Sequence, residues 1–154
     1  MKETIALAFA ATLATTPAPV EQIGDWTIGF GQGFFEYRVQ NGQQNSFIIS
    51  CDRGGKGYGV IMFVEVGGQS PGSHEPVTAA VGETEFTIHT DEDGVGVTTC
   101  EACSKAFEGL FEALKSHDRM TVKLAAGASA DFATGGGREA LPDSCATDFE
   151  GPNR

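Results

Sequence analysis

The chain has 154 residues, with 10 Lys and Arg against 21 Asp and Glu, which gives a formal net charge of −11. Proteins that bind nucleic acid or an anionic membrane surface need a basic face, so this charge argues against both classes. Apolar residues make up 40% of the chain and 21 residues are glycine, a composition that favours one folded domain of short strands and tight turns.

The first 18 residues are predicted to be a secretory signal peptide. One early lysine precedes an apolar run at residues 5–14, and small residues and prolines follow it. This run is too short to span a bilayer, which takes about 20 residues. Cleavage is expected after Ala14 or Ala18, and a buried N-terminal helix is the alternative interpretation. We therefore expect residues 19–154 to form a single secreted or periplasmic domain without a membrane span.

Most of the chain after this leader has the pattern of short β-strands. Strands are predicted at residues 25–31, 34–40, 46–51, 58–66, 76–80, 84–90, 95–99, 119–125 and 130–134. The Asn41–Gly42 dipeptide is a strong hairpin signal. The run at 58–66 is almost continuously apolar, which predicts a strand buried on both faces.

One amphipathic helix is predicted at about residues 99–116. The sequence Thr98-Thr99-Cys100-Glu101 fits a capping box. Apolar side chains then follow at helical spacing: Cys103, Ala106, Phe107, Leu110, Phe111 and Leu114. A run of strands, one helix and a closing hairpin predict a mainly β fold, an antiparallel β-sandwich or barrel with this helix packed on it.

Four cysteines follow the leader: Cys51, Cys100, Cys103 and Cys145. An even number of cysteines in a secreted chain predicts two disulfides. We favour a local Cys100–Cys103 bridge and a long Cys51–Cys145 bridge that ties the C-terminal tail to an early strand, and a crossed pairing stays open. The long bridge would close a large loop, which in the chain-entropy model stabilises by several kcal/mol.

The Cys100-Glu101-Ala102-Cys103 segment has a second interpretation. Free backbone N–H groups and the helix dipole stabilise a thiolate at a helix N-terminus, which is the basis of thioredoxin-type disulfide exchange. However, only a hairpin and a tail follow this helix, without a second βαβ half. A structural disulfide is therefore preferred, a thiol–disulfide oxidoreductase is the alternative, and a zinc site made by all four cysteines is a third interpretation.

The remaining patterns predict no metal, no cofactor and no enzymatic activity. The Asp91–Gly94 segment lacks the downstream Glu of a calcium loop and is interpreted as a solvated turn. The glycine-rich segments 54–57 and 135–137 lack the spacing of a phosphate-binding loop. Three histidines have neither the spacing of a metal pair nor an accompanying nucleophile elbow: His74, His89 and His117.

Several of these features together resemble a known family. They are Gly24-Asp25-Trp26, the Cys100/Cys103 pair before the helix, the strand that begins Met120-Thr121 and the late Arg138-Glu139-Ala140-Leu141. In this order they resemble the invasion-associated locus B family of small secreted bacterial β-proteins, over about half the chain. That family has an early cysteine pair, whereas Cys51 has no near partner here. The resemblance implies a periplasmic or surface sandwich that acts by binding and has no catalytic residue.

The leading hypothesis is a secreted or periplasmic, disulfide-stabilised binding protein without enzymatic activity. Its acidic surface suits a basic protein partner, in a host-interaction or an inhibitor or immunity role. Candidate contact residues are aromatic residues and loop acids: Phe34, Phe35, Tyr37, Tyr58, Asp91, Glu92 and Asp93. A periplasmic thiol–disulfide oxidoreductase that uses Cys100 and Cys103 is the alternative.

Overall fold

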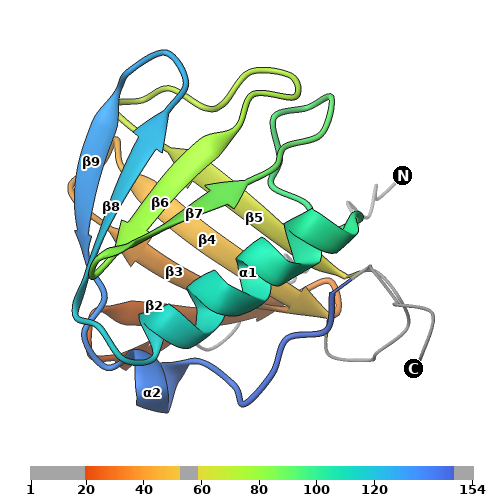
Figure 1. Ribbon diagram of the computed structural model, residues 1–154. Helices are drawn as coiled ribbons and strands as arrows, with labels where there is room; N and C mark the ends of the chain where they lie inside the picture. Colours follow the sequence, from red (N-terminus) through yellow and green to blue (C-terminus); the bar gives the residue numbers. More distant parts are fainter. Residues whose placement is uncertain (1–19, 53–58, 148–154) are drawn as a thin grey trace, which may run out of the picture.

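A computed structural model describes residues 20–52 and 59–147, which form two antiparallel sheets packed together (Figure 1). The five-stranded sheet has the order β1 (Glu21–Ile23), β2 (Trp26–Gly31), β3 (Phe34–Gln40), β4 (Ser46–Asp52) and β5 (Val60–Glu65). The four-stranded sheet has the order β7 (Thr84–Ile88), β6 (Val77–Val81), β8 (Arg119–Leu124) and β9 (Ser129–Ala133). The predicted mainly β sandwich with one amphipathic helix is confirmed.

Alternation of inward and outward side chains along the strands builds one core between the sheets. In the five-stranded sheet, Ile28 pairs with Tyr37, Tyr37 with Ile49 and Ile49 with Met62, so one row of side chains faces the second sheet. The largest fully buried side chains include Trp26, from the start of β2. Side chains one position away in each strand face outward, because successive residues of a strand point to opposite faces.

Two predictions about strands are wrong. We expected β5 to be buried on both faces, but Val60, Met62 and Val64 are buried while Phe63 between them is 43% exposed. The physical reason is that the four-stranded sheet covers only the inner face of β5. We also expected a strand at 95–99, but this segment makes only isolated bridges, in which Gly96 pairs with Met62 on one side and Thr90 on the other.

Helix α1 (Glu101–Leu114) lies beside β7 and covers an open side of the sandwich (Figure 1). Its apolar stripe, which includes Phe107, Leu110 and Leu114, is buried in the core as its spacing predicts. Gly109 lets the helix approach the sheet, because a Cβ at this position would lie 2.8 Å from the Phe86 ring. Within residues 20–52 and 59–147, no helix is long and apolar enough to cross a membrane.

A short second helix, α2 (Gly137–Ala140), follows β9, and the chain then runs past α1 to Cys145 (Figure 1). Cys145 forms a disulfide with Cys51 in β4, at a sequence separation of 94, and Cys100 forms one with Cys103. This is the pairing favoured from the sequence, and it leaves no crossed pairing. In the chain-entropy model a loop of this length stabilises the fold by about 4.7 kcal/mol.

The two sheets are joined by a set of contacts that we name the Gly24–Trp26 clamp, between residues 24–26 at the start of β2 and residues 134–136 after β9. The Asp25 N–H donates to the Gly135 carbonyl oxygen at 2.9 Å, and the Gly135 N–H donates to Asp25 Oδ2 at 2.7 Å. The Trp26 indole N–H donates to the Thr134 carbonyl oxygen at 3.0 Å, out of contact with water. Gly24 has a φ of +57°, and a Cβ there would collide with the Gly135 carbonyl group.

We predict that Gly24→Ala lowers the free energy of unfolding by roughly 3 kcal/mol or more. A left-handed conformation costs a residue with a Cβ about 1–2 kcal/mol, and the collision with Gly135 adds to that cost. Gly42→Ala is the matched control, since Gly42 has a φ of +72° but no described atom within 4 Å of the added Cβ. Urea denaturation of both variants measures the difference. Equal losses of stability would show that the clamp is not tightly packed.

Candidate functional site

The two sheets present different outer faces. On the four-stranded sheet the outward positions carry small and polar side chains, among them Thr78, Thr87 and Lys123. On the five-stranded sheet the outward positions carry a group of apolar side chains beside polar ones: Phe34, Ile48, Ile61 and Phe63 with Glu36, Arg38 and Ser50. The candidate site is therefore the outer face of the five-stranded sheet.

The described residues form two hollows on this face, and both hollows include Phe63 in their lining. The first, which we name the outer-face hollow, has a volume of about 290 Å³ and is lined by Gly31, Gln32, Phe34, Glu36, Ser50, Ile61 and Phe63. The second has a volume of about 310 Å³ and lies toward the β5 edge, where its lining includes Ile48, Glu65 and Asp93. Both hollows combine apolar walls with a carboxylate, which suits a ligand with an apolar part and a positive charge.

Ser50 has an unusual environment in the outer-face hollow. It is 4% exposed, and its Oγ has no hydrogen-bond partner among the described residues. A hydroxyl buried without a partner costs about 1–3 kcal/mol of stability, so such groups are rare. In the sheet it lies between Glu36 of β3 and Ile61 of β5. Ser50 therefore offers an unused hydrogen-bonding group at the floor of the hollow.

The aromatic contact residues proposed in β3 lie on opposite faces of the strand, because successive side chains alternate. Phe34 faces outward and lines the hollow, whereas Phe35 is half-buried and packs against the core. Tyr37 is only 6% exposed and belongs to the core, so the prediction that it is a surface contact is wrong. Tyr37 points inward because it pairs with Ile28 and Ile49. Tyr58 lies outside the described residues.

In the acidic turn after β7, one carboxylate stabilises the turn and the other two are exposed. Asp91 Oδ1 accepts hydrogen bonds from the N–H groups of Asp93 and Val95, each at 2.9 Å, which closes the turn. Glu92 and Asp93 are exposed, and Asp93 also lines the hollow near the β5 edge. Of the three proposed acidic contacts, Asp93 is therefore the one that the fold places at the candidate face.

Among the described residues, no group of three or more potential metal-ligating side chains forms a site for a metal ion.

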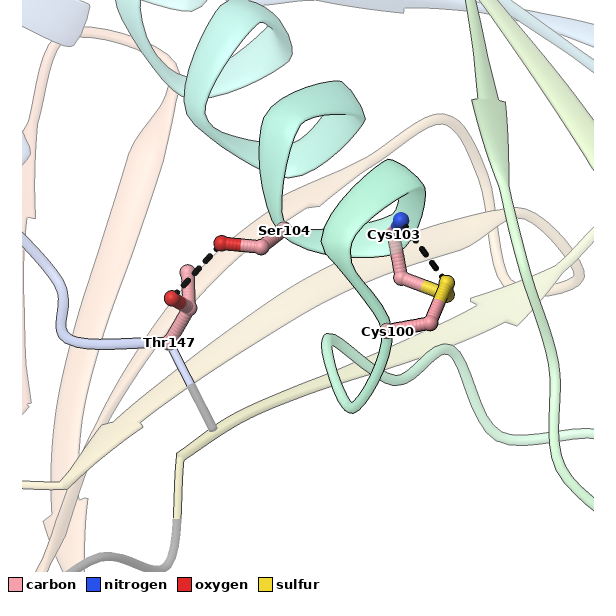
Figure 2. Close-up of a disulfide and its surroundings, with 4 residues drawn as sticks. All are labelled: Cys100, Cys103, Ser104 and Thr147. Atoms are coloured by element: carbon pink, nitrogen blue, oxygen red, sulfur yellow. Dashed lines mark hydrogen bonds between the residues drawn. A yellow bond between two sulfur atoms is a disulfide. The ribbon is translucent and has the colours of Figure 1, made fainter. Parts of the chain in front are cut away.

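The Cys100–Cys103 disulfide begins helix α1 (Figure 2). Cys100 is the exposed N-cap residue and its Sγ accepts the Cys103 N–H at 3.0 Å, while Cys103 is 6% exposed. Next to it, Ser104 Oγ donates to Thr147 Oγ1 at 2.7 Å, which holds the C-terminal segment to the helix. Because all four cysteines form disulfides, the interpretation as a four-cysteine zinc site is wrong.

A surface ion pair lies beside this disulfide. Lys105 Nζ contacts Glu101 Oε1 at 2.6 Å across one helical turn. The hydrogen bond and charge of Lys105 lower the pKa of Glu101. Both side chains are exposed, so this pair contributes little to stability, and it leaves little net charge beside the exposed Cys100.

Sequence reasoning missed Glu36, Ser50, Ile61 and Phe63 as members of one site. The interpretation of 58–66 as a doubly buried strand removed Ile61 and Phe63 from consideration. A signal was present in β4, where Ser46 and Ser50 occupy positions of the same parity and so share one face. Two serines on the same face of an otherwise apolar strand indicate that this face is not covered by another layer.

The fold and the disulfides define a class: an antiparallel β-sandwich with two disulfides, one helix along its open side and an apolar, acidic hollow on one outer face. Residues 24–141 match the model of the YfjT family, and the chain belongs to this family. No curated protein and no solved structure matches it. The match begins at Gly24 and ends after α2, so the whole Gly24–Trp26 clamp lies within it while Cys145 does not. Nothing found links the chain to the invasion-associated locus B family, and that resemblance stays a prediction.

The burial of Tyr37 predicts a pH dependence of stability. Burial raises the pKa of Tyr37 above the usual value near 10, so the unfolded chain ionises at this position before the folded one does. The contribution of Tyr37 to the free energy of unfolding is fully present below about pH 10 and is lost as the pH rises further. Tyr37→Phe should therefore lose less stability than the wild type between about pH 9 and pH 11, as measured by urea denaturation. An unchanged loss in the variant would contradict the core position.

Proposed function

We propose that this protein acts outside the cytoplasm as a disulfide-stabilised binding protein, and that a basic protein partner docks on the outer face of the five-stranded sheet. The observation that carries this proposal is Phe63, a large aromatic side chain that is 43% exposed on that face. Aromatic side chains supply much of the binding energy at protein interfaces. The two disulfides are typical of an oxidising compartment.

The surroundings of Phe63 support a docking surface. Ile48, its cross-strand partner, and Ile61 on the same strand are half-buried and extend the apolar area on both sides. Polar residues border this area, and an apolar centre with a polar rim is typical of interfaces. Exposed apolar patches of this kind on a folded domain commonly mark interaction sites.

Charge supports a basic partner. The chain has a net charge of −11, and the described residues that line the two hollows include three carboxylates: Glu36, Glu65 and Asp93. Arg38 is a cation on the same face, but it lines neither hollow. Opposite charge speeds association and disfavours acidic competitors.

The second candidate function is thiol–disulfide exchange at Cys100 and Cys103, because Cys100 is exposed while its partner is buried. A thiolate of a substrate dithiol would attack Cys100 Sγ and release the Cys103 thiolate, which takes up a proton. The second substrate thiolate would then displace Cys100 from the mixed disulfide. Two electrons pass from the substrate to the protein, which leaves a substrate disulfide and a Cys100/Cys103 dithiol.

Site-specific photocrosslinking tests the binding function. We expect a benzophenone side chain at position 63 to give one discrete adduct in the producing cells, with a partner that is basic and binds the purified protein saturably. The same group at Thr87, an exposed position on the outer face of the four-stranded sheet, is the matched control and should give none. An absence of adducts from both positions, or the same adducts from both, would contradict the proposal.

The reduction potential of the Cys100–Cys103 disulfide tests the second candidate. A structural disulfide is expected to have a potential below about −300 mV, whereas an exchange catalyst lies nearer −120 to −270 mV. Equilibration with glutathione buffers and mass spectrometry of the trapped thiols gives this value. The Cys51–Cys145 disulfide in the same sample is the internal control. A potential in the structural range would rule out the exchange function and leave the binding function intact.

A further inference from the structure

We propose that the outer-face hollow binds an arginine side chain of the basic partner. Phe34 and Phe63 would flank the guanidinium group, Glu36 would neutralise it, and the Ser50 hydroxyl would accept one of its hydrogen bonds. This inference rests on the proposed binding function and names the chemistry that the face recognises.

The apolar walls come from strands that are far apart in the chain. Phe34 begins β3 and Phe63 lies within β5, and both line the hollow together with Ile61. A guanidinium group is planar and weakly hydrated, so it stacks on aromatic faces at a low desolvation cost. The volume of about 290 Å³ is small and suits one side chain rather than a whole folded element.

The carboxylate of Glu36 is open to a ligand. Glu36 is exposed on β3 and forms no ion pair with the lysines and arginines of the described residues. On the neighbouring strand β2, Gly29 is its cross-strand partner and Gly31 lines the hollow. A Cβ at either glycine would meet no described atom within 4 Å, so the sheet is unobstructed on this side of Glu36.

Ser50 supplies the observation that points to a ligand. Its hydroxyl is buried, belongs to the lining of the hollow and lacks a partner among the described residues. Arginine has five N–H donors in a fixed planar arrangement and no acceptor, so one guanidinium can bond a carboxylate and a hydroxyl oxygen at once. Lysine offers a compact ammonium group that does not stack in this way. The combination of two phenylalanines, a carboxylate and an unpaired hydroxyl therefore favours arginine.

A second copy of this chain is a poorer occupant. Two molecules that each carry −11 repel one another, and Glu36 would then meet further carboxylates. A separate basic chain gains from the same charges. We therefore assign the hollow to a partner and treat self-association as an outcome of the test.

A titration followed by NMR tests the assignment, with the oxidised protein labelled with ¹⁵N and the blocked tripeptide acetyl-Gly-Arg-Gly-amide as probe. We expect saturable shifts of the amide signals of Gln32, Phe34, Ser50 and Phe63. Replacement of arginine by citrulline keeps the shape but removes the charge, and should weaken binding by about tenfold or more. The corresponding lysine peptide should bind less tightly than the arginine peptide, because it loses the stacking.

Two variants locate the binding. Glu36→Gln should weaken the arginine peptide about tenfold, while Glu85→Gln, an exposed carboxylate on the outer face of the other sheet, should leave it unchanged. Ser50→Ala should also weaken binding. It removes an unpaired buried hydroxyl, so its free energy of unfolding should be equal to or higher than that of the wild type. This difference separates a role in binding from a role in folding.

The outcomes separate this inference from the proposed function. Equal binding of the citrulline peptide, or no effect of Glu36→Gln, would overturn the arginine site even if crosslinking at position 63 identifies a basic partner. Shifts that depend on protein concentration without peptide would assign the face to a second copy and would also overturn it. If the peptide binds as expected but no partner crosslinks, the arginine site stands and the proposed function fails.

Discussion

The hydrogen bond from the Trp26 indole to the Thr134 carbonyl oxygen joins residues 108 positions apart, and it holds Trp26 in the orientation that sets the inner and outer faces of the five-stranded sheet. It fixes the first long strand of one sheet to the end of the last strand of the other. The Asp25–Gly135 pair beside it adds two further bonds, and Gly24 is needed because no side chain fits between the two backbones there. The YfjT family match spans 24–141, so this closure lies at the two ends of the segment that defines the family.

Once this clamp fixes β2, the outer face follows from strand geometry. Trp26 must point inward, so the register carried through β3 and β4 to β5 sends Tyr37, Ile49 and Met62 inward as well. The residues one position away must then point to the outer face. They include Glu36, Ser50 and Phe63. A slip of one residue would exchange the two sets and bury Glu36 in the core, at a cost that no contact there would offset.

This dependence also explains what the sequence could and could not predict. Alternation located most strands, helical spacing located α1, and an even cysteine count indicated two disulfides. The sequence could not predict which alternate residues of β3 face the core, because Phe34, Phe35 and Tyr37 place aromatic side chains on both faces of one strand. The inward residues of β5 were equally unpredictable, because this strand is apolar at almost every position. Both ambiguities are resolved only by pairing with β2 and β4, and the hollow itself joins residues of four strands, which no local pattern reveals.

The long disulfide strengthens this arrangement without taking part in the site. Cys51 immediately follows Ser50 in β4, so the two side chains point to opposite faces of the sheet. The bond from Cys51 to Cys145 draws the C-terminal segment onto the inner side, where the Ser104–Thr147 hydrogen bond holds it against α1. A register slip in β4 would turn Cys51 away from Cys145, so the disulfide opposes the slip covalently. The Cys51–Cys145 bond is thus also a bond that keeps Ser50, and with it the floor of the hollow, on the outer face.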